Sequence, residues 1–450
     1  MAATVTETQS GTTRALNRPT NHERMPHAVK FTPMRDLPAN ARYCVLLEPM
    51  WAVTGTIVLY YATLYMKSVG LSNISIGIIM SANLYAAFVF QLVAGAVTDR
   101  FGRRWTTLIF DLTSWVLPMF IWAFSHNFWL FLIAYLLSAT SKIVNVSFSL
   151  LASEETPKEQ RARVFAAIKL IIMAAGLLTP IVGGLMAHYG TVPTLRVVYL
   201  LGGVTMLVHF VWRHQMTTET AAGRAAMRRH QSIGLTRSVI ESFRLFGISC
   251  RSPRMWPIVG IYVLSNLAVQ INLFQVIYLN DVLKFSTATI SYLPALTAAL
   301  ALVCYLVVMP RLHGKHVVTI TLITLAMSGL GWAMFLAIPE HGLLLLLTST
   351  ALTGAGLFLL ESYRDALLVN ELHDRDRAAL FSAVQSVTAV VAIPSGYVAA
   401  VLYDQDPRLP YTVIVGCYTI SAALALILRR APERTGTQPV PAPEKAWSEA

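Results

Sequence analysis

Charged residues are scarce in this chain of 450 residues. Asp, Glu, Lys and Arg make up 13% of it and hydrophobic residues 55%, whereas a typical soluble domain has about 25% charged residues. The mean hydropathy is +0.57. A water-soluble fold would have too few charged side chains to cover its surface. The composition therefore excludes a soluble protein and predicts an integral membrane protein.

Cysteine pairs and the signatures of common enzymes are also lacking. The four cysteines (Cys44, Cys250, Cys304 and Cys417) stand singly, so neither a disulfide framework nor a metal site is predicted. The sequence contains no Gly-x-x-x-x-Gly-Lys-Ser/Thr phosphate loop, no His-Glu-x-x-His zinc motif and no Gly-x-Ser-x-Gly nucleophile elbow. We therefore expect no enzymatic activity, no metal and no cofactor.

Long apolar stretches dominate what is present, and each has the length of about 20 residues that crosses a bilayer as a helix. The twelve predicted spans are 43–66, 73–98, 105–124, 127–150, 164–187, 196–213, 255–279, 289–309, 317–338, 342–367, 378–403 and 411–428. We predict an N-terminal tail (1–42), a six-helix bundle (43–213), a central loop (214–254), a second six-helix bundle (255–430) and a C-terminal tail (431–450). The polar first tail predicts no cleaved signal peptide.

Positive charge predicts the orientation. Of the 35 Lys and Arg residues, 28 fall in the tails and in the loops after spans 2, 4, 6, 8 and 10, and four fall in the opposite loops. This bias places both termini in the cytoplasm and the chain in the plasma membrane. It also accounts for the net charge of +12 without nucleic acid as a partner.

The central loop is basic and contains a helical pattern. Leu235, Val239, Phe243 and Phe246 recur at helical spacing, which predicts an amphipathic helix on the cytoplasmic membrane surface with anionic lipids as partners. A disordered linker is the alternative.

The two halves resemble each other in sequence. Glu155 and Arg161 after span 4 match Glu371 and Arg377 after span 10, at a shift of 216 residues. In span 5 "TPIVGGLMAHY" matches "IPSGYVAAVLY" in span 11, so that Pro180 and Pro394 correspond at a shift of 214. Parallel repeats of this kind occur in secondary transporters that bind their substrate between the halves, near the bilayer midplane.

The loop between spans 2 and 3 reads "GAVTDRFGRRWTTL". It resembles the signature Gly-x-x-x-Asp-Arg-x-Gly-Arg-Arg/Lys of the major facilitator superfamily. The matching residues are Gly95, Asp99, Arg100, Gly102, Arg103 and Arg104. The resemblance covers about residues 43–430 and implies the superfamily fold: all-α, with twelve transmembrane helices in two pseudo-symmetric halves of six. The corresponding loop of the second half keeps Gly314 and Lys315 but has no equivalent of Asp99.

By resemblance, this loop is a conformational latch between the halves. We expect Gly95 to let two helices approach closely, Gly102 to form the tight turn, and Asp99 to pair with the other half. Arg100, Arg103 and Arg104 are expected to hold the loop on the anionic inner leaflet. Simple positive-inside anchoring, the alternative, explains the arginines but neither Asp99 nor the glycines.

Span 5 partly resembles a motif of drug/proton antiporters. The antiporters tend to carry Gly-x-x-x-Gly-Pro-x-x-Gly-Gly here, and this chain keeps the helix-bend residues Pro180, Gly183 and Gly184. Ala175 and Thr179 replace the other two glycines. In span 4, Ser138 stands where the antiporters carry an arginine. The resemblance to exporters is therefore partial.

Ionisable groups inside spans are costly unless they are paired or hydrated, which makes them candidates for function. Glu48 in span 1 and Glu361 and Asp365 in span 10 are the candidate proton-coupling carboxylates. The alternative for Glu48 is a structural carboxylate at the membrane interface. For Asp111 in span 3 this interfacial role is the favoured interpretation. The alternative for the span-10 residues is an ion-pair network in which Glu361 compensates the charge of Arg364.

Other polar residues within spans are candidates for substrate binding. They are Lys142 and Asn145 in span 4, Asn266 and Gln270 in span 7, and Arg364 in span 10. The alternatives are hydrogen bonds between helices and, for Lys169 in span 5, a side chain that reaches the interface.

The sequence thus predicts a secondary transporter that moves a small organic solute by alternating access, as a monomer powered by the proton gradient. Proton-coupled efflux of an amphipathic drug or metabolite is the first interpretation. Proton-coupled import of a small organic anion or nutrient is the alternative. A transporter-like membrane receptor or sensor is the alternative of another class.

Overall fold

Helices make up nearly all of the chain that the structure describes. The structure is a computed structural model. The residues it describes are 37–229, 254–312, 316–371 and 377–430. No strand occurs among these residues. The chain divides into a short unit, Met1–Leu37, and a large unit, Pro38–Ala450, which holds every described helix.

Twelve helical segments are long and apolar enough to cross a membrane, which confirms the predicted number of spans. The first half contains α1 (Ala39–Ser68); α2 (Asn73–Phe101); α3 (Arg103–Asp111), η2 (Leu112–Val116) and α4 (Leu117–Phe124); α5 (Phe128–Ser138) and α6 (Ser141–Ser153); α7 (Lys158–Ala175), η3 (Gly176–Leu178) and α8 (Thr179–Tyr189); and α9 (Thr191–Met216). The short helix α10 (Ala221–Arg229) follows α9.

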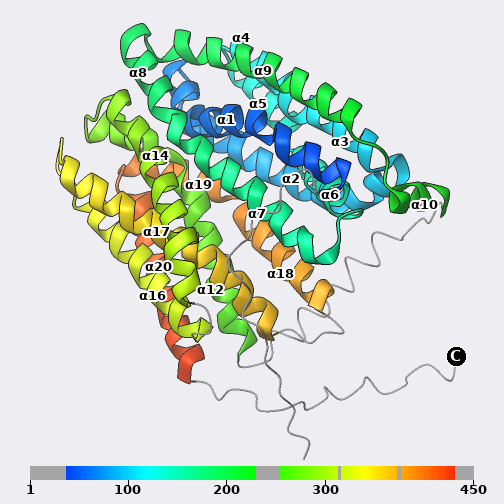
Figure 1. Cartoon of the computed structure of the whole chain (residues 1–450). Helices are drawn as coiled ribbons and strands as arrows, with labels where there is room; N and C mark the ends of the chain where they lie inside the picture. The colour runs from blue at the N-terminus through cyan, green and yellow to red at the C-terminus, as the bar shows by residue number, and fades with distance from the viewer. Residues whose placement is uncertain (1–36, 230–253, 313–315, 372–376, 431–450) are drawn as a thin grey trace, which may run out of the picture. The chain divides into compact units, whose positions relative to one another are not determined.

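The second half contains six further spans. They are α12 (Met255–Ile271), η4 (Asn272–Phe274), α13 (Gln275–Ile277) and η5 (Tyr278–Val282); α14 (Thr287–Val303), η6 (Cys304–Val308) and α15 (Met309–Leu312); α16 (Val317–Leu336); α17 (Leu343–Glu371); α18 (Arg377–Ala392) and α19 (Ser395–Gln405); and α20 (Leu409–Arg430). In Figure 1, α1–α9 run from blue to green and α12–α20 from green to red.

The spans run in alternating directions, so every loop lies at one of two ends. We call the end that carries the α2–α3 loop the Asp99 end. The opposite end, where α1 leads into α2, is the Lys67 end.

The internal repeat is visible in the helix caps. At the start of α2, Ser72 Oγ accepts a hydrogen bond from Ser75 N–H at 3.1 Å, and at the start of α14, Ser286 Oγ accepts one from Thr289 N–H at 3.2 Å. Each cap satisfies a backbone donor that has no partner within its helix. Ser72 and Ser286 are 214 residues apart, the shift that also relates Pro180 to Pro394.

Spans 5 and 11 are both interrupted beside these prolines. A 3₁₀ turn separates α7 from α8, whose second residue is Pro180. In span 11, Pro394 lies directly before α19. Proline lacks a backbone N–H and its ring clashes with the preceding turn, so a continuous helix is disfavoured at both places.

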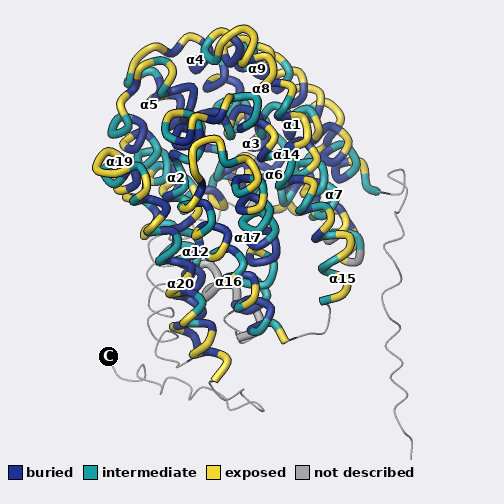
Figure 2. Tube along the Cα trace, turned by 90° about the vertical axis from the view of Figure 1, so that its left-hand side faces the viewer, coloured by how far each residue is buried: buried dark blue, intermediate teal, exposed yellow. Residues whose placement is uncertain are grey.

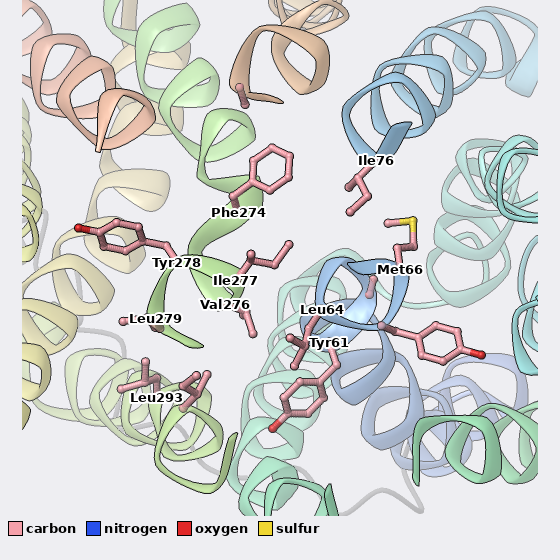
Figure 3. Close-up of a cluster of buried hydrophobic side chains, with 14 of the residues drawn as sticks. Tyr61, Leu64, Met66, Ile76, Phe274, Val276, Ile277, Tyr278, Leu279 and Leu293 are labelled. Atoms are coloured by element: carbon pink, nitrogen blue, oxygen red, sulfur yellow. The ribbon is translucent and has the colours of Figure 1, made fainter. Parts of the chain in front are cut away.

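The apolar core is continuous between the two halves. Along single helices, buried residues alternate with exposed ones (Figure 2). In Figure 3, Val276 and Ile277 of α13 lie on the side of their helix that faces Leu64 of α1. All three belong to one buried hydrophobic cluster. The halves are therefore held together partly by burial of apolar surface.

The structure differs from the sequence prediction at several helix boundaries. Helix α1 begins at Ala39 rather than at residue 43, and α9 continues to Met216 rather than ending at residue 213. Arg213, the last residue of predicted span 6, therefore lies within the last turn of α9 rather than at its end. The predicted amphipathic helix at 235–246 lies outside the described residues.

Candidate functional site

The loop between α2 and α3 is organised around Arg103, which is 6% exposed. Its guanidinium contacts Asp99 Oδ1 at 2.9 Å and Glu154 Oε1 at 3.0 Å. Gly102 has a φ of +81°, a conformation that side chains rarely adopt, and it makes the turn between the helices. The described partner of Asp99 therefore lies in its own half, whereas we had expected a partner in the other half.

The other residues of the loop have separate contacts. The Arg104 guanidinium donates two hydrogen bonds to the carbonyl oxygen of His214, at 3.0 and 2.8 Å. Arg100 is exposed and lies over the ring of Phe101. A Cβ at Gly95 would meet no atom within 4 Å, so the expected close approach of two helices does not occur there in this structure.

A cluster of charges is buried inside the first half. Glu48 of α1, Asp111 at the end of α3 and Arg213 of α9 are 5%, 2% and 4% exposed. Arg213 forms an ion pair with Asp111, and its guanidinium lies over the rings of Phe148 and Phe210, at 5.1 and 5.2 Å from their centroids. Glu48 interacts electrostatically with both charged neighbours. We call these three residues the first-half cluster.

Sequence reasoning selected Glu48 but missed its partner. Arg213 is near the end of its span, and a basic residue at such a position usually belongs to the adjoining cytoplasmic loop rather than to a buried cluster. A buried carboxylate is stabilised by a nearby cation or by a proton, so two carboxylates within spans, Glu48 and Asp111, were a signal to look for an arginine on a neighbouring span. The π-helical turn η2 begins directly after Asp111, and turns of this kind are frequent at functional sites.

The second half holds a cluster of the same residue types. The Arg364 guanidinium lies 4.0 Å from the ring centroid of Tyr262, and its Nη1 donates to Ser265 Oγ at 3.1 Å. Arg364 Nε is 3.6 Å from Asp365 Oδ1, too far for a hydrogen bond. Tyr262 Oη donates to the same carboxylate oxygen at 2.9 Å.

Glu361 does not form the ion pair with Arg364 that was the structural alternative for span 10. It is exposed, and it forms no salt bridge with a described residue. Arg364 instead points across to α12, where Tyr262 and Ser265 contact it. Sequence reasoning missed both of these residues because they lie on another helix. We call Glu361, Arg364 and Asp365 the second-half cluster.

The remaining polar candidates form no side-chain hydrogen bonds with one another among the described residues. Lys142, Asn266 and Gln270 are half-buried and Asn145 is exposed. The structure shows no side-chain hydrogen bond from these four residues to another described residue. Among the described residues, no three His, Cys, Asp or Glu side chains are placed to hold a metal ion.

The two halves are joined toward the Lys67 end. Four hydrogen bonds connect described residues of the two halves: Tyr60 Oη to Ile290 O (3.1 Å), Asn73 Nδ2 to Asp404 Oδ1 (2.6 Å), Thr179 Oγ1 to Ser291 O (2.9 Å) and Tyr397 N–H to Ser81 Oγ (2.9 Å). Nearer the Asp99 end, the Lys169 ammonium lies 5.5 Å from the ring centroid of Phe358. Lys169 therefore contacts the other half.

Glycines permit close approach of the halves at the Lys67 end. A Cβ at Gly77 would lie 2.5 Å from the carbonyl oxygen of Gly396, and a Cβ at Gly183 would overlap the Ser291 side chain. A Cβ at Gly184 would meet no atom within 4 Å. Of the predicted helix-bend residues, Pro180 thus lies at the helix interruption and Gly183 at the contact between halves.

The sequence matches the model of the Major Facilitator Superfamily over residues 50–360. The chain belongs to the major facilitator superfamily. With its twelve candidate spans it is a multi-pass membrane protein, and its family is one of transporters rather than enzymes.

Two curated bacterial proteins align with part of the chain. The quinolone resistance protein NorA of Staphylococcus aureus (strain MRSA252) is 21% identical over 192 residues, which are 41% of this chain and 49% of NorA. The uncharacterized MFS-type transporter YhjO of Bacillus subtilis is 26% identical over 160 residues, 35% of this chain and 39% of YhjO. The chain thus spans half the length of these relatives or less.

Solved structures of superfamily transporters share the fold over most of their length. The nucleoside transporter NupG has a TM-score of 0.66 at 15% identity, over 87% of this chain and 98% of NupG. A bacterial homologue of the iron transporter ferroportin, in its inward-facing state, has a TM-score of 0.64 at 12% identity, over 87% and 99%. At these identities the likeness concerns the fold alone.

Proposed function

We propose that this transporter exports an amphipathic organic solute in exchange for protons, and that Glu48 binds the coupled proton. The buried first-half cluster carries the proposal. Arg213 pairs with Asp111 and interacts electrostatically with Glu48. One cation thus faces two carboxylates, and the ionised cluster has an uncompensated negative charge in a region where such a charge is costly. Because Asp111 pairs directly with Arg213, Glu48 is the carboxylate that a proton neutralises.

The direction of transport is inferred from two observations. NorA is named for resistance to quinolones, and such resistance fits export of amphipathic compounds. Span 5 of this chain keeps the Pro180, Gly183 and Gly184 part of the antiporter motif, and Gly183 lies where the halves meet. Both observations favour export over import.

The solute binds between the halves and reaches either side by alternating access. The half-buried or exposed polar groups of spans 4, 7 and 10 are its contacts: Lys142, Asn145, Asn266, Gln270 and Arg364. The present structure is the state closed at the Lys67 end. If the termini are cytoplasmic, as the positive charges predict, this is the inward-facing state.

Closure at the Lys67 end can be tested at Gly77. Gly77→Leu adds a side chain where a Cβ alone would press on the Gly396 carbonyl, so it should hold this end open. Gly184→Leu is the matched control, because its Cβ has free space. Distances between spin labels at positions 189 and 340 should increase only in the Gly77 variant. Equal distances in both variants would contradict the proposed closure.

Import of a small organic anion is the second candidate function, and one observation favours it. Arg364 Nε is buried and makes no hydrogen bond, so the guanidinium has a donor to offer to a carboxylate or phosphate group. In the importer, a proton gradient directed inward drives accumulation of an anion. In the exporter, the same gradient drives expulsion of an amphipathic compound.

Proteoliposome flux distinguishes the proposals. For the exporter, a proton gradient should drive movement of an amphipathic dye in the direction opposite to the protons in the wild type. Glu48→Gln should abolish gradient-driven flux yet keep dye exchange at equal pH, because a glutamine mimics the protonated carboxylate. Glu361→Gln tests the other candidate carboxylate. Gradient-driven flux that survives Glu48→Gln would remove Glu48 from coupling, and cotransport of protons with an organic anion would favour the importer.

A further inference from the structure

The segment that leaves α9, Thr217–Gly223, lies against the Asp99 loop, and we call it the strap. Its central residue is Glu219. One carboxylate oxygen of Glu219 accepts a hydrogen bond from Arg103 N–H at 3.0 Å, and the other accepts one from Arg104 N–H at 2.9 Å. These are the first two N–H groups of α3, which have no acceptor within the helix. Glu219 therefore caps the helix that carries Arg103.

The strap is attached to two further loops of the first half. Thr220 donates a hydrogen bond to Glu154, the carboxylate that also holds Arg103. Asn40, near the start of α1, accepts from Thr218 N–H at 2.9 Å and donates to Thr218 O at 3.0 Å. The strap thus has fixed positions on both sides of Glu219.

Two glycines make room for the Glu219 carboxylate. A Cβ at Gly102 would lie 2.6 Å from Glu219 Oε2, and a Cβ at Gly223 would overlap Glu219 Oε1. The carboxylate is therefore enclosed between the turn of the Asp99 loop and the first turn of α10. Any larger residue at either position would displace it.

We propose that Glu219 is a positioning residue of the latch. It holds the turn from Gly102 to Arg104 so that Arg103 bridges Asp99 and Glu154. The inference rests on the prediction that the Asp99 loop is a latch between the halves. Because the chain runs from the strap to the second half, Glu219 also ties the connection between the halves to the latch itself.

Removal of the Glu219 charge should act on the latch in a defined way. Glu219→Gln keeps the shape but places an NH₂ group against one of two N–H donors, so one of the two charge-assisted hydrogen bonds is lost. The negative charge that favours a helix N-terminus is lost as well. Arg103 would then lose its fixed position, and the state closed at the Asp99 end, which needs the latch, should become less populated.

The experiment measures the two ends separately in the full-length protein. In a variant without native cysteines, spin labels at 158 and 311 report on the Asp99 end, and labels at 189 and 340 on the Lys67 end. Glu219→Gln should lower the population closed at the Asp99 end about tenfold, equivalent to about 1.4 kcal/mol. Asp99→Asn should shift it in the same direction, and the double variant no further than the larger single shift.

Gly223→Ala is a second route to the same result. The added methyl group presses on Glu219, and also on Arg103 Cδ and Thr220 Oγ1, each 2.9 Å from the Cβ position, so it disturbs the contact of the strap with the Asp99 loop without altering a charge. Alanine favours the α10 helix, so a shift of the equilibrium would not reflect unfolding. Glu155→Gln is the matched control: this exposed carboxylate of the neighbouring loop accepts a hydrogen bond from Asn40, and the oxygen of a glutamine can accept the same bond, so the strap keeps its anchor while one negative charge is removed. Melting temperatures should stay within a few degrees for all of these variants.

The outcomes separate this inference from the latch itself. If Asp99→Asn shifts the equilibrium but Glu219→Gln and Gly223→Ala do not, Glu219 is not a positioning residue and the latch stands. If none of the variants shifts it, the latch is wrong as well. A shift toward closure at the Asp99 end in Glu219→Gln would mean that Glu219 stabilises the present state instead, and would overturn the inference.

Discussion

The two halves carry charged clusters of identical composition in very different surroundings. Each has two carboxylates and one arginine. In the first-half cluster all three residues are at most 5% exposed, and Arg213 is paired with Asp111 between two phenylalanine rings. In the second-half cluster the Asp365 side chain is 51% exposed and Glu361 is exposed.

The difference teaches that the same residues serve different tasks when their access to water differs. A sealed cluster cannot exchange charge with solvent ions, so its charge changes only by binding or releasing a proton. An accessible cluster can be compensated by water, ions or a charged solute. We therefore infer that the first half couples protons and the second half contacts the solute.

The largest expected effect is that of Arg213→Gln. It leaves Asp111 and Glu48 buried without a cation, which should lower the free energy of unfolding by about 3–5 kcal/mol. Thermal unfolding in detergent measures this. Asp111→Asn combined with Arg213→Gln should regain much of the loss, because the pair is then neutral. A loss no larger than that of Arg364→Gln would show that the first-half cluster is not sealed.

Arg364→Gln should have a smaller effect on stability, about 1–3 kcal/mol, because water reaches the carboxylates that remain. If Arg364 holds an anionic solute, ligand binding should fall more than stability. Glu361→Gln in the same chain should restore neither property, since Glu361 does not contact Arg364. Restored stability in the double variant would support an ion pair between Glu361 and Arg364, the structural alternative for span 10.

Glu48→Gln should change stability by less than about 1 kcal/mol at neutral pH. A glutamine has the shape of the protonated carboxylate, so the cluster stays neutral in the variant. Unfolding in detergent near pH 7 checks this. A loss of several kcal/mol would mean that Glu48 is ionised and required as an anion in the folded protein, which contradicts its role as the proton site.

Glu361→Gln should have the smallest effect, within about 0.5 kcal/mol, as is usual for exposed side chains away from specific contacts. The same unfolding assay applies. The comparison between the halves would fail if this substitution destabilised the protein as much as Arg213→Gln does.

Much of the fold was predictable from hydropathy and repeats. Twelve spans in two halves follow from the length of apolar stretches, and the superfamily follows from the Asp99 loop. The second-half cluster shows where such reasoning stops. The spacing of Glu361 and Arg364 along one helix indicated an ion pair as the structural alternative for span 10, but Arg364 turns toward Tyr262 and Ser265 of another helix.

The sequence by itself determined which segments lie in the membrane, because burial of about 20 apolar residues is a local property. It also determined the helix caps at Ser72 and Ser286, which depend on neighbours a few residues away. Only the tertiary structure decided that Arg213 is sealed beside Asp111 and that Glu219 caps α3. Both contacts join residues about 100 or more positions apart, and electrostatic pairing at that separation depends on how the helices pack.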